Sequence, residues 1–189
     1  MIYAHPREDS LAAALRDAAK AALESAGHSV ELRDLYAEGF NPVLSAEERA
    51  RYHDVPANMA GVEEHVAALR RAEALLLVHP TWWYGMPAIL KGWFDRVWSP
   101  GVAFHLGAGA IEPALTNVRK IGVITTYGSP AWLLWYIGRI DRKLIGRGIR
   151  RLCARDCKVE WLTLTRMDQR TRAECEAFVS RVRARLARW

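Results

Sequence analysis

Hydrophobic residues along this chain form short apolar runs that alternate with longer stretches of helical spacing. The clearest run, Ala74–Val78, is typical of a buried parallel strand, and it leads through three consecutive aromatic residues and a turn at Gly85 to a helix expected to begin at Pro87. Other runs predict strands at Met1–Ala4, Ser29–Leu35, Lys120–Thr126 and Lys158–Leu164. Helical spacing predicts helices at Ser10–Ala26, Val62–Arg71, Pro87–Trp98, Ala131–Cys157 and Thr171–Trp189, with a short helix near Ser45–Arg51.

This alternation of strands and helices predicts an α/β fold of three layers, in which helices cover both faces of a parallel sheet. Five strands favour the order 2-1-3-4-5, which places a ligand at the carboxyl edge of the sheet, where the winding reverses. No internal repeat or linker is evident, so residues 1–189 are interpreted as a single domain. The glycine-rich stretch Ser99–Pro113 is expected to form a flap over the site.

The first strand is short, because only Met1–Ala4 precede the His5-Pro6 turn, whereas a central strand usually has five or six residues. We therefore expect residues upstream of Met1 to complete it.

Composition narrows the functional classes. Half of the residues (51%) are hydrophobic and 25% are charged, as in a globular protein, and the net charge is +6. Much of the basic excess falls on the two C-terminal helices and is interpreted as a solvated surface. Nothing besides the net charge supports nucleic-acid binding, so we expect none. The three cysteines, Cys153, Cys157 and Cys175, lack zinc-site spacing; they are interpreted as free thiols in a reducing cytoplasm, with no metal site.

Three loops should meet at the carboxyl edge, because parallel strands end there together. The loop His5–Ser10 precedes a helix N-terminus, where backbone N–H groups attract phosphate and where His5 and Ser10 could donate hydrogen bonds. The loop Pro80–Gly85 offers backbone amides and an aromatic wall, with Gly85 expected to leave no room for a β-carbon.

The third loop, Thr125–Ser129, adds two hydroxyls and a glycine that permits close backbone approach. A phosphate site, an aromatic wall and amide donors together suit a planar, phosphate-bearing redox ring, which describes a flavin. Neither a P-loop nor a G-x-G-x-x-G pattern is present, so the usual nucleotide signatures do not apply.

At these residues the chain resembles the NAD(P)H:quinone oxidoreductase family. This family of flavodoxin-like flavoproteins includes quinone reductases and ancillary flavoproteins of potassium efflux systems. The resemblance covers about residues 1–130, and its most specific part is Pro80–Val97. Further matching motifs are Ala4-His5-Pro6 with Ser10, Asp34-Leu35-Tyr36, Phe40-Asn41-Pro42, Val102-Ala103-Phe104 and Thr125-Thr126.

The resemblance implies a flavodoxin-like fold, bound FAD or FMN with FAD favoured, and ping-pong, two-electron reduction of quinones by NADH or NADPH. It also implies a homodimer with the site at the interface. By matching position, His5 and Ser10 would hold the phosphates and Phe104 would belong to a substrate lid. The flavin would be lined by Pro80, Thr81, Trp82, Trp83, Tyr84, Thr125, Thr126 and Gly128.

Two departures from the family affect the chemistry. Family members commonly carry Gly-Gly after Thr-Thr, whereas Tyr127 replaces the first glycine here. The usual downstream tyrosine and histidine that stabilise reduced flavin are also missing, since no histidine follows His105. Tyr127 and Tyr136 are candidate catalytic substitutes by position only.

Several alternatives remain open. The apolar stretch Ala131–Ile137 is interpreted as a dimer interface, a quinone-entry lip or a patch that contacts a membrane. Besides a cytoplasmic NAD(P)H dehydrogenase, the sequence fits a regulatory flavoprotein subunit of a transporter. A flavodoxin-like electron carrier fits less well, because such carriers usually present acidic surfaces.

Overall fold

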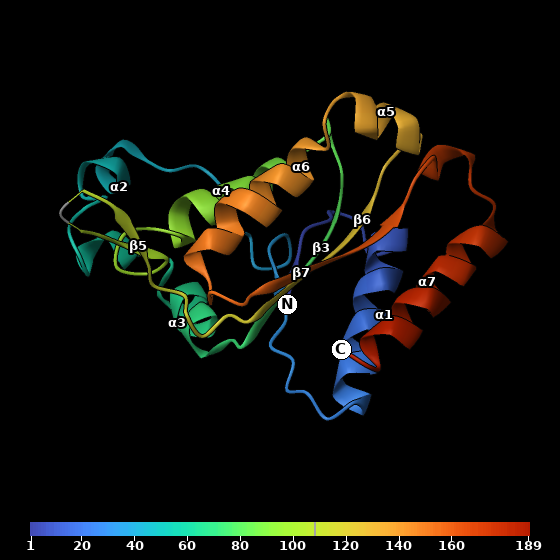
Figure 1. Ribbon diagram of the computed structural model, residues 1–189, viewed down its shortest axis with the longest axis horizontal. Coiled ribbons are helices and arrows are strands. Elements are labelled where there is room, and N and C mark those ends of the chain that lie inside the picture. Colours follow the sequence, from blue (N-terminus) through green and yellow to red (C-terminus); the bar gives the residue numbers. More distant parts are fainter. Residues whose placement is uncertain (108) are drawn as a thin grey trace.

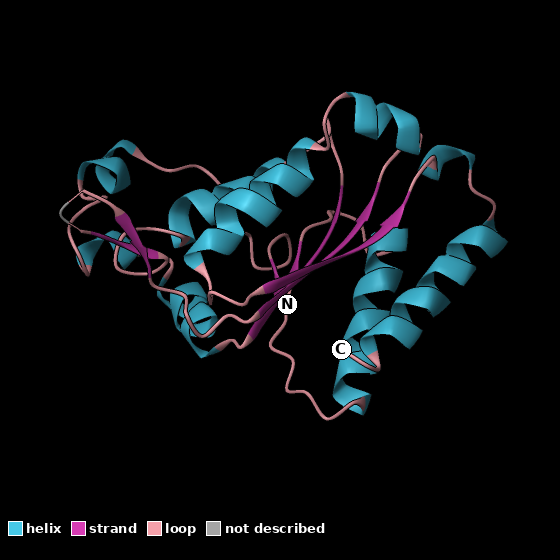
Figure 2. Cartoon of the chain, in the orientation of Figure 1, coloured by secondary structure: helices cyan, strands magenta, loops and turns pink. Residues whose placement is uncertain are grey.

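The computed structural model describes residues 1–107 and 109–189 and contains a five-stranded sheet in which all paired strands run parallel. The strand order is β2-β1-β3-β6-β7, which confirms the predicted 2-1-3-4-5 arrangement, since β6 and β7 are the fourth and fifth strands of this sheet in chain order. The strands are β1 (Ile2–Tyr3), β2 (Arg33–Asp34), β3 (Ala74–Pro80), β6 (Lys120–Thr126) and β7 (Lys158–Leu164). Figures 1 and 2 show the sheet in the middle with helices on either side.

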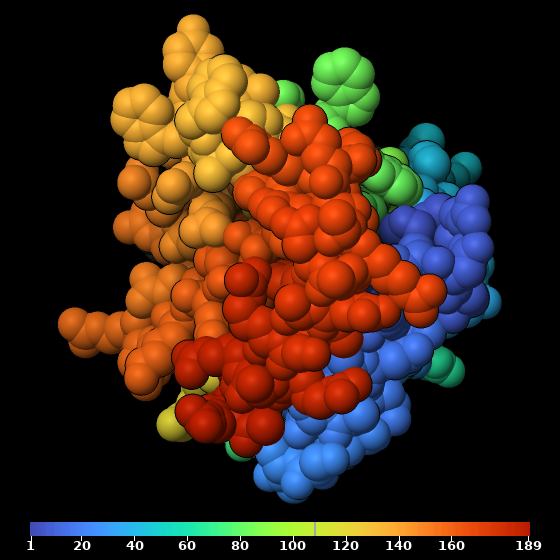
Figure 3. Space-filling model, turned by 90° about the vertical axis from the view of Figure 1, so that its right-hand side faces the viewer, coloured from blue at the N-terminus to red at the C-terminus, as the bar shows by residue number. Residues whose placement is uncertain are grey.

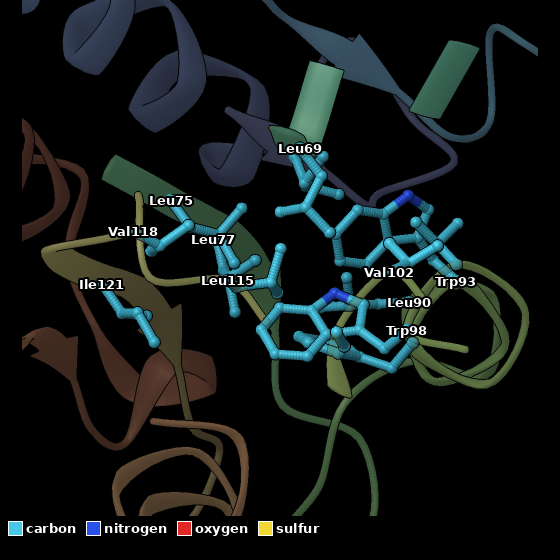
Figure 4. Packing of buried hydrophobic residues seen from close by; sticks show 14 of the residues in the cluster. Leu69, Leu75, Leu77, Leu90, Trp93, Trp98, Val102, Leu115, Val118 and Ile121 are labelled. Carbon is cyan, nitrogen blue, oxygen red and sulfur yellow. The ribbon is translucent and has the colours of Figure 1, made fainter. Parts of the chain in front are cut away.

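Alternation along β3 divides the core into two layers. Leu75 and Leu77 point to one face, covered by α3 (Glu63–Arg71), α4 (Ala88–Val97) and the segment after α6 (Ile140–Lys143). Figure 4 shows Leu75 and Leu77 in this layer together with Trp93 and Trp98.

The opposite face of β3, formed by Leu76 and Val78, is covered by α1 (Leu11–Ser25) and α7 (Arg172–Leu186). These two helices lie side by side on the right of Figure 1. Burial on both faces explains why β3 has a nearly continuous apolar sequence.

Side-chain caps fix the helix starts. Ser10 accepts the Ala13 N–H at 3.1 Å and caps α1, as expected. Capping boxes at Ser45 and Thr171 begin α2 (Ala46–Ala50) and α7. Pro87 has extended backbone angles and precedes α4 as its N-cap, so the helix begins one residue later than predicted.

Two predicted elements differ from the structure. The alternating stretch Ser29–Leu35 forms a strand only at Arg33–Asp34, because β1 offers partners for these two residues alone. The expected flap contains a two-stranded antiparallel hairpin, β4 (Phe104–Leu106) and β5 (Ile111–Pro113), at the left of Figure 1; the part of the flap at residue 108 lies outside the described residues.

The stretch between β6 and β7 is helical, as predicted, but broken into short pieces. They are α5 (Ala131–Tyr136), α6, a wider π turn at Leu144–Gly148 and a 3-10 turn at Ile149–Leu152. Two further 3-10 turns occupy Ala57–Met59 and Met167–Gln169. Within the two described ranges, every helix is too short or too polar to cross a bilayer.

Candidate functional site

The loops that follow β1, β3 and β6 meet at the carboxyl edge of the sheet. His5 and Trp82 bring the first two together, with ring centroids 6.3 Å apart. The hydroxyl oxygens of Thr81 and Thr125 lie 2.9 Å apart and join the second loop to the third. The Ser129 hydroxyl donates to the Tyr84 hydroxyl at 3.2 Å. The expected convergence of the three loops is therefore present.

The aromatic loop is a tight turn with an unusual backbone. Trp82 and Gly85 exchange N–H···O bonds of 3.1 Å in both directions, and the two residues between them, Trp83 and Tyr84, have φ angles of 50° and 61°. Such left-handed angles normally require glycine, and each costs a larger residue about 1–2 kcal/mol. The Trp83 side chain is 97% exposed and the Trp82 side chain 44%, so local packing does not explain the indoles.

The aromatic loop leaves room for a β-carbon at Gly85, contrary to expectation. Its φ is not positive, and a β-carbon there would only make ordinary contacts of 3.9 and 4.0 Å with the Trp82 and Trp83 carbonyl oxygens. The expected crowding at Gly85 is therefore wrong.

Of the four backbone N–H groups from Thr81 to Tyr84, two are available to a ligand. The Thr81 N–H donates to Thr126 at 2.9 Å and the Trp82 N–H to Gly85, so both are engaged within the fold. The N–H groups of Trp83 and Tyr84 have no hydrogen-bond acceptor anywhere in residues 1–107 or 109–189. The aromatic loop thus presents two free amides beside two exposed indoles.

His5 and Ser10 both lie in the first loop, where hydrogen bonds fix their side chains. The His5 Nδ1 lies within hydrogen-bond distance of both the N–H (3.1 Å) and the carbonyl oxygen (3.2 Å) of Arg7, while no hydrogen bond engages its Nε2 within the described residues. The Ser10 hydroxyl donates to the Arg7 carbonyl at 2.8 Å while it accepts the Ala13 N–H. The His5 Nε2 is therefore available to a ligand, whereas the Ser10 hydroxyl must first break its bond to Arg7.

The strand tips beneath the loops are buried. Pro80 ends β3 opposite Thr126, and Thr125 is fully buried. Thr126 contributes its carbonyl oxygen to Thr81, so the two threonines serve mainly to join the strand tips. A β-carbon on Gly128 would lie 2.8 Å from a carboxylate oxygen of Asp168, a residue that sequence reasoning did not identify because it follows β7.

Tyr127 points into the protein. It is 4% exposed, and its hydroxyl makes a short hydrogen bond to the buried carboxylate of Asp141. Burial, followed by the contact with Asp141, raises the pKa of Tyr127 far above its usual value. At neutral pH this phenol keeps its proton and shares it with Asp141 instead of a ligand.

A buried histidine lies one residue before Pro80. The His79 Nδ1 contacts the Pro80 carbonyl at 2.9 Å, while its Nε2 has no partner in the part of the chain that the structure describes. Burial lowers the pKa of His79, so the ring is neutral.

The other two candidates lie outside the three loops. Tyr136 is exposed at the end of α5. Phe104 lies in the β4–β5 hairpin, where it packs against the core. In Figure 1 this hairpin lies at the far left, away from α5 at the top, so the structure does not place Phe104 over this chain's own loops.

An apolar surface adjoins the aromatic loop. It consists of Trp132, Trp135 and Tyr136 on α5, which are 65%, 72% and 77% exposed, together with Ile140 and Leu144. The gold side chains around α5 and the green ones around the aromatic loop project from the same end in Figure 3. We call this set the α5 patch; such a cluster of exposed aromatic side chains is typical of an interaction surface.

A model described as the flavodoxin-like fold matches residues 1–187. The chain is 39% identical over 109 residues to the uncharacterized NAD(P)H oxidoreductase YcaK of Escherichia coli, covering 57% of this chain and 55% of the relative. It is 32% identical over 145 residues to NAD(P)H dehydrogenase (quinone) 1 of Cavia porcellus, covering 68% and 53%. The chain therefore spans just over half the length of these relatives.

Among solved structures, the chain is similar to an NAD(P)H:quinone oxidoreductase from Methanothermobacter marburgensis. The TM-score is 0.80 and the identity 28%, with 98% of this chain and 93% of the other covered.

Proposed function

Because this chain belongs to the flavodoxin-like fold family, and its relatives include proteins named NAD(P)H oxidoreductases and quinone dehydrogenases, we propose that it is a flavin-dependent NAD(P)H dehydrogenase that reduces quinones. The observation that carries the proposal is the aromatic loop, where two exposed indoles and two free backbone amides project beside the tips of β1 and β6. Left-handed backbone angles such as those of Trp83 and Tyr84 destabilise the fold, and such strained residues cluster at functional sites.

The residues present fit a flavin. Indole faces suit a planar aromatic ring, and amides fixed by a tight turn suit ring oxygens and nitrogens that gain negative charge on reduction. The N-terminal amides of α1 and the His5 Nε2 suit phosphate oxygens. Both FAD and FMN carry these groups, and we propose FAD on the resemblance alone.

When bound, a flavin would accept hydride from NADH or NADPH and deliver two electrons to a quinone. This chain's contribution is to bind and orient: Trp82 and Trp83 would stack against the ring and exclude water from one side of it. The amides of Trp83 and Tyr84 would stabilise developing negative charge without moving. Tyr127 positions the loop after β6 through Asp141, and it does not serve as a proton donor.

We propose that a second copy of the chain covers the α5 patch. The patch lies close to the aromatic loop, because Ser129, two residues before α5, donates a hydrogen bond to Tyr84, so dimerisation would enclose the site. Phe104 could then act as a lid only on the site of the other copy. A cytoplasmic location is proposed from the three free thiols.

The proposal is tested by kinetics on the purified protein. Anaerobic NADH or NADPH should bleach a bound chromophore, and a quinone should restore its colour with the parallel-line pattern of ping-pong kinetics. The mass of the extracted chromophore distinguishes FAD from FMN. A protein that is bleached but not reoxidised by quinones would support the alternative of a regulatory flavoprotein subunit. A protein that binds no flavin at all would contradict both.

A further inference from the structure

The positive charge of this protein is concentrated in one segment. Residues 139–158 contain eight lysines and arginines and two aspartates, a net charge of +6, which equals the net charge of all 189 residues. The rest of the chain is therefore neutral overall. Within this segment, residues 140–152 form the helical stretch made of α6, the π turn and the 3-10 turn. In Figure 3 the segment is orange and lies along the left edge, below the gold side chains of α5.

The side of this helical stretch that faces away from the sheet is basic. Asp141 and Ile145 are buried, which identifies the inner side. Residues two positions apart in a helix are separated by about 200° around its axis, so the residues two positions from these point outward. The outward residues are all basic and exposed, and we call them the basic stripe: Arg139, Lys143, Arg147 and Arg151.

The charges of the basic stripe are not paired with acids of the chain. None of its four residues takes part in an ion pair within residues 1–107 and 109–189. The acid nearest in sequence, Asp141, lies on the inner side and accepts the Tyr127 hydroxyl. By contrast, Arg142 is held by the fold, because its guanidinium lies 5.1 Å from the centroid of the Trp161 ring. The basic stripe therefore presents four uncompensated charges to its surroundings.

An exposed stripe without hydrogen-bonding side chains lies beside the basic one. It consists of Ile140, Leu144 and Gly148, each of which directly follows a member of the basic stripe. Adjacent basic and apolar strips on one helix are typical of binding in the headgroup region of an anionic membrane. Nucleic-acid sites instead add hydroxyl, amide or aromatic side chains that contact sugars and bases. The residues beside the basic stripe therefore favour a lipid surface as its partner.

We propose that the basic stripe docks the protein on the surface of an anionic lipid bilayer. The negative headgroups supply the counter-charge that the stripe lacks, and each lysine or arginine near such a surface strengthens binding about fivefold. None of the four basic residues belongs to the α5 patch, so the proposed second copy and the bilayer use different side chains. An apolar quinone would dissolve in the same bilayer, but the proposal rests on the charge and exposure of the stripe and not on the proposed function.

Co-sedimentation of the whole protein with lipid vesicles tests the proposal. Vesicles of phosphatidylcholine alone are compared with vesicles in which about a third of the lipid is phosphatidylglycerol. The protein should bind the anionic vesicles and not the neutral ones, and about 0.5 M salt should release it, because salt screens the attraction. Arg147→Gln combined with Arg151→Gln should weaken the binding about 25-fold. The melting temperature of this variant should equal that of wild type, since both side chains are exposed.

The matched control is Arg183→Gln combined with Arg188→Gln, which removes two exposed charges near the C-terminus, outside the basic stripe. This variant should bind anionic vesicles within about threefold of wild type, because its lost charges do not face the bilayer. Equal weakening by the two pairs of substitutions would assign the binding to net charge and overturn the proposal. Equal binding to neutral vesicles, or binding to duplex DNA without binding to anionic vesicles, would also overturn it. No flavin is added, so the outcome is independent of the proposed function.

Discussion

The two halves of the segment 80–97 use aromatic residues in opposite ways. In the first half, Trp82 and Trp83 project into solvent from a strained turn. In the second half, Trp93 is 1% exposed within α4, and its indole N–H donates to the His65 Nδ1 at 3.2 Å. Within this continuous motif, α4 packs in the core and holds the loop in place, whereas the loop is available to a ligand. We call residues 80–87 the binding half and residues 88–97 the packing half.

The largest expected effect is a loss of stability from a substitution in the packing half. In the α4 helix, a β-carbon on Gly92 would overlap both the backbone and the side chain of Pro42. Gly92→Val should therefore destabilise the protein by about 3 kcal/mol or more, measured as the free energy of unfolding in urea. Gly146→Ala is the matched control, because nothing lies within 4 Å of its added β-carbon. Equal stability of the two variants would show that α4 can move away from Pro42.

Trp93 and Trp83 offer the sharpest contrast between the two halves. Trp93→Ala should cost about 3–5 kcal/mol of stability, because it removes a buried ring and leaves His65 without its donor. Trp83→Ala should change stability by less than about 0.5 kcal/mol but weaken flavin binding about tenfold. The measurements are urea unfolding and flavin titration of both variants. Loss of stability in Trp83→Ala would contradict the division between binding and packing.

The packing half should also carry a pH dependence through His65. Burial, aided by Arg33, lowers the pKa of His65 to about 4, whereas an unfolded histidine titrates near 6.5. Between these values the unfolded chain binds more protons, so stability falls as the pH drops from about 6.5 to 4, by about 2 kcal/mol.

His65→Gln retains an acceptor for the Trp93 indole and removes the titration. The difference in unfolding free energy between wild type and His65→Gln should therefore change over this pH range. A constant difference would show that His65 is protonated equally in both states.

A smaller effect tests the strained turn itself. Glycine adopts the φ of Trp83 without penalty, so Trp83→Gly should be about 1 kcal/mol more stable than Trp83→Ala. Both variants should lose flavin affinity equally, because both lack the indole. Gly85→Ala should change neither property measurably. Equal stability of the Gly and Ala variants at position 83 would show that the backbone relaxes elsewhere.

The sequence predicted those parts of the fold in which local pattern and tertiary partners agree. β6 and β7 have the predicted bounds, because each has a neighbour along its full length. β2 does not, because the pattern at Ser29–Leu35 requires a partner strand that β1 supplies only at Arg33 and Asp34. The length of a strand depends on how far its partner strand extends beside it, so the pattern of one segment alone does not predict it.

The sequence predicted some features of the candidate site and missed others, as it did for the fold. The meeting of three loops followed from topology, and the structure contains it. The inward direction of Tyr127 could not be predicted, since its partner Asp141 lies in a short helix whose place depends on the fold. The location of the left-handed angles on Trp83 and Tyr84 also contradicts the usual preference for glycine.

Flavin fluorescence measures the central claim most directly. Stacking on an indole quenches the fluorescence of the isoalloxazine ring, so titrating the protein into FMN and into FAD reports contact between the ring and Trp82 or Trp83. The account predicts strong, saturable quenching by wild type and much weaker quenching by Trp83→Ala at the same concentrations. Unquenched fluorescence of both flavins at saturating wild-type protein would contradict it.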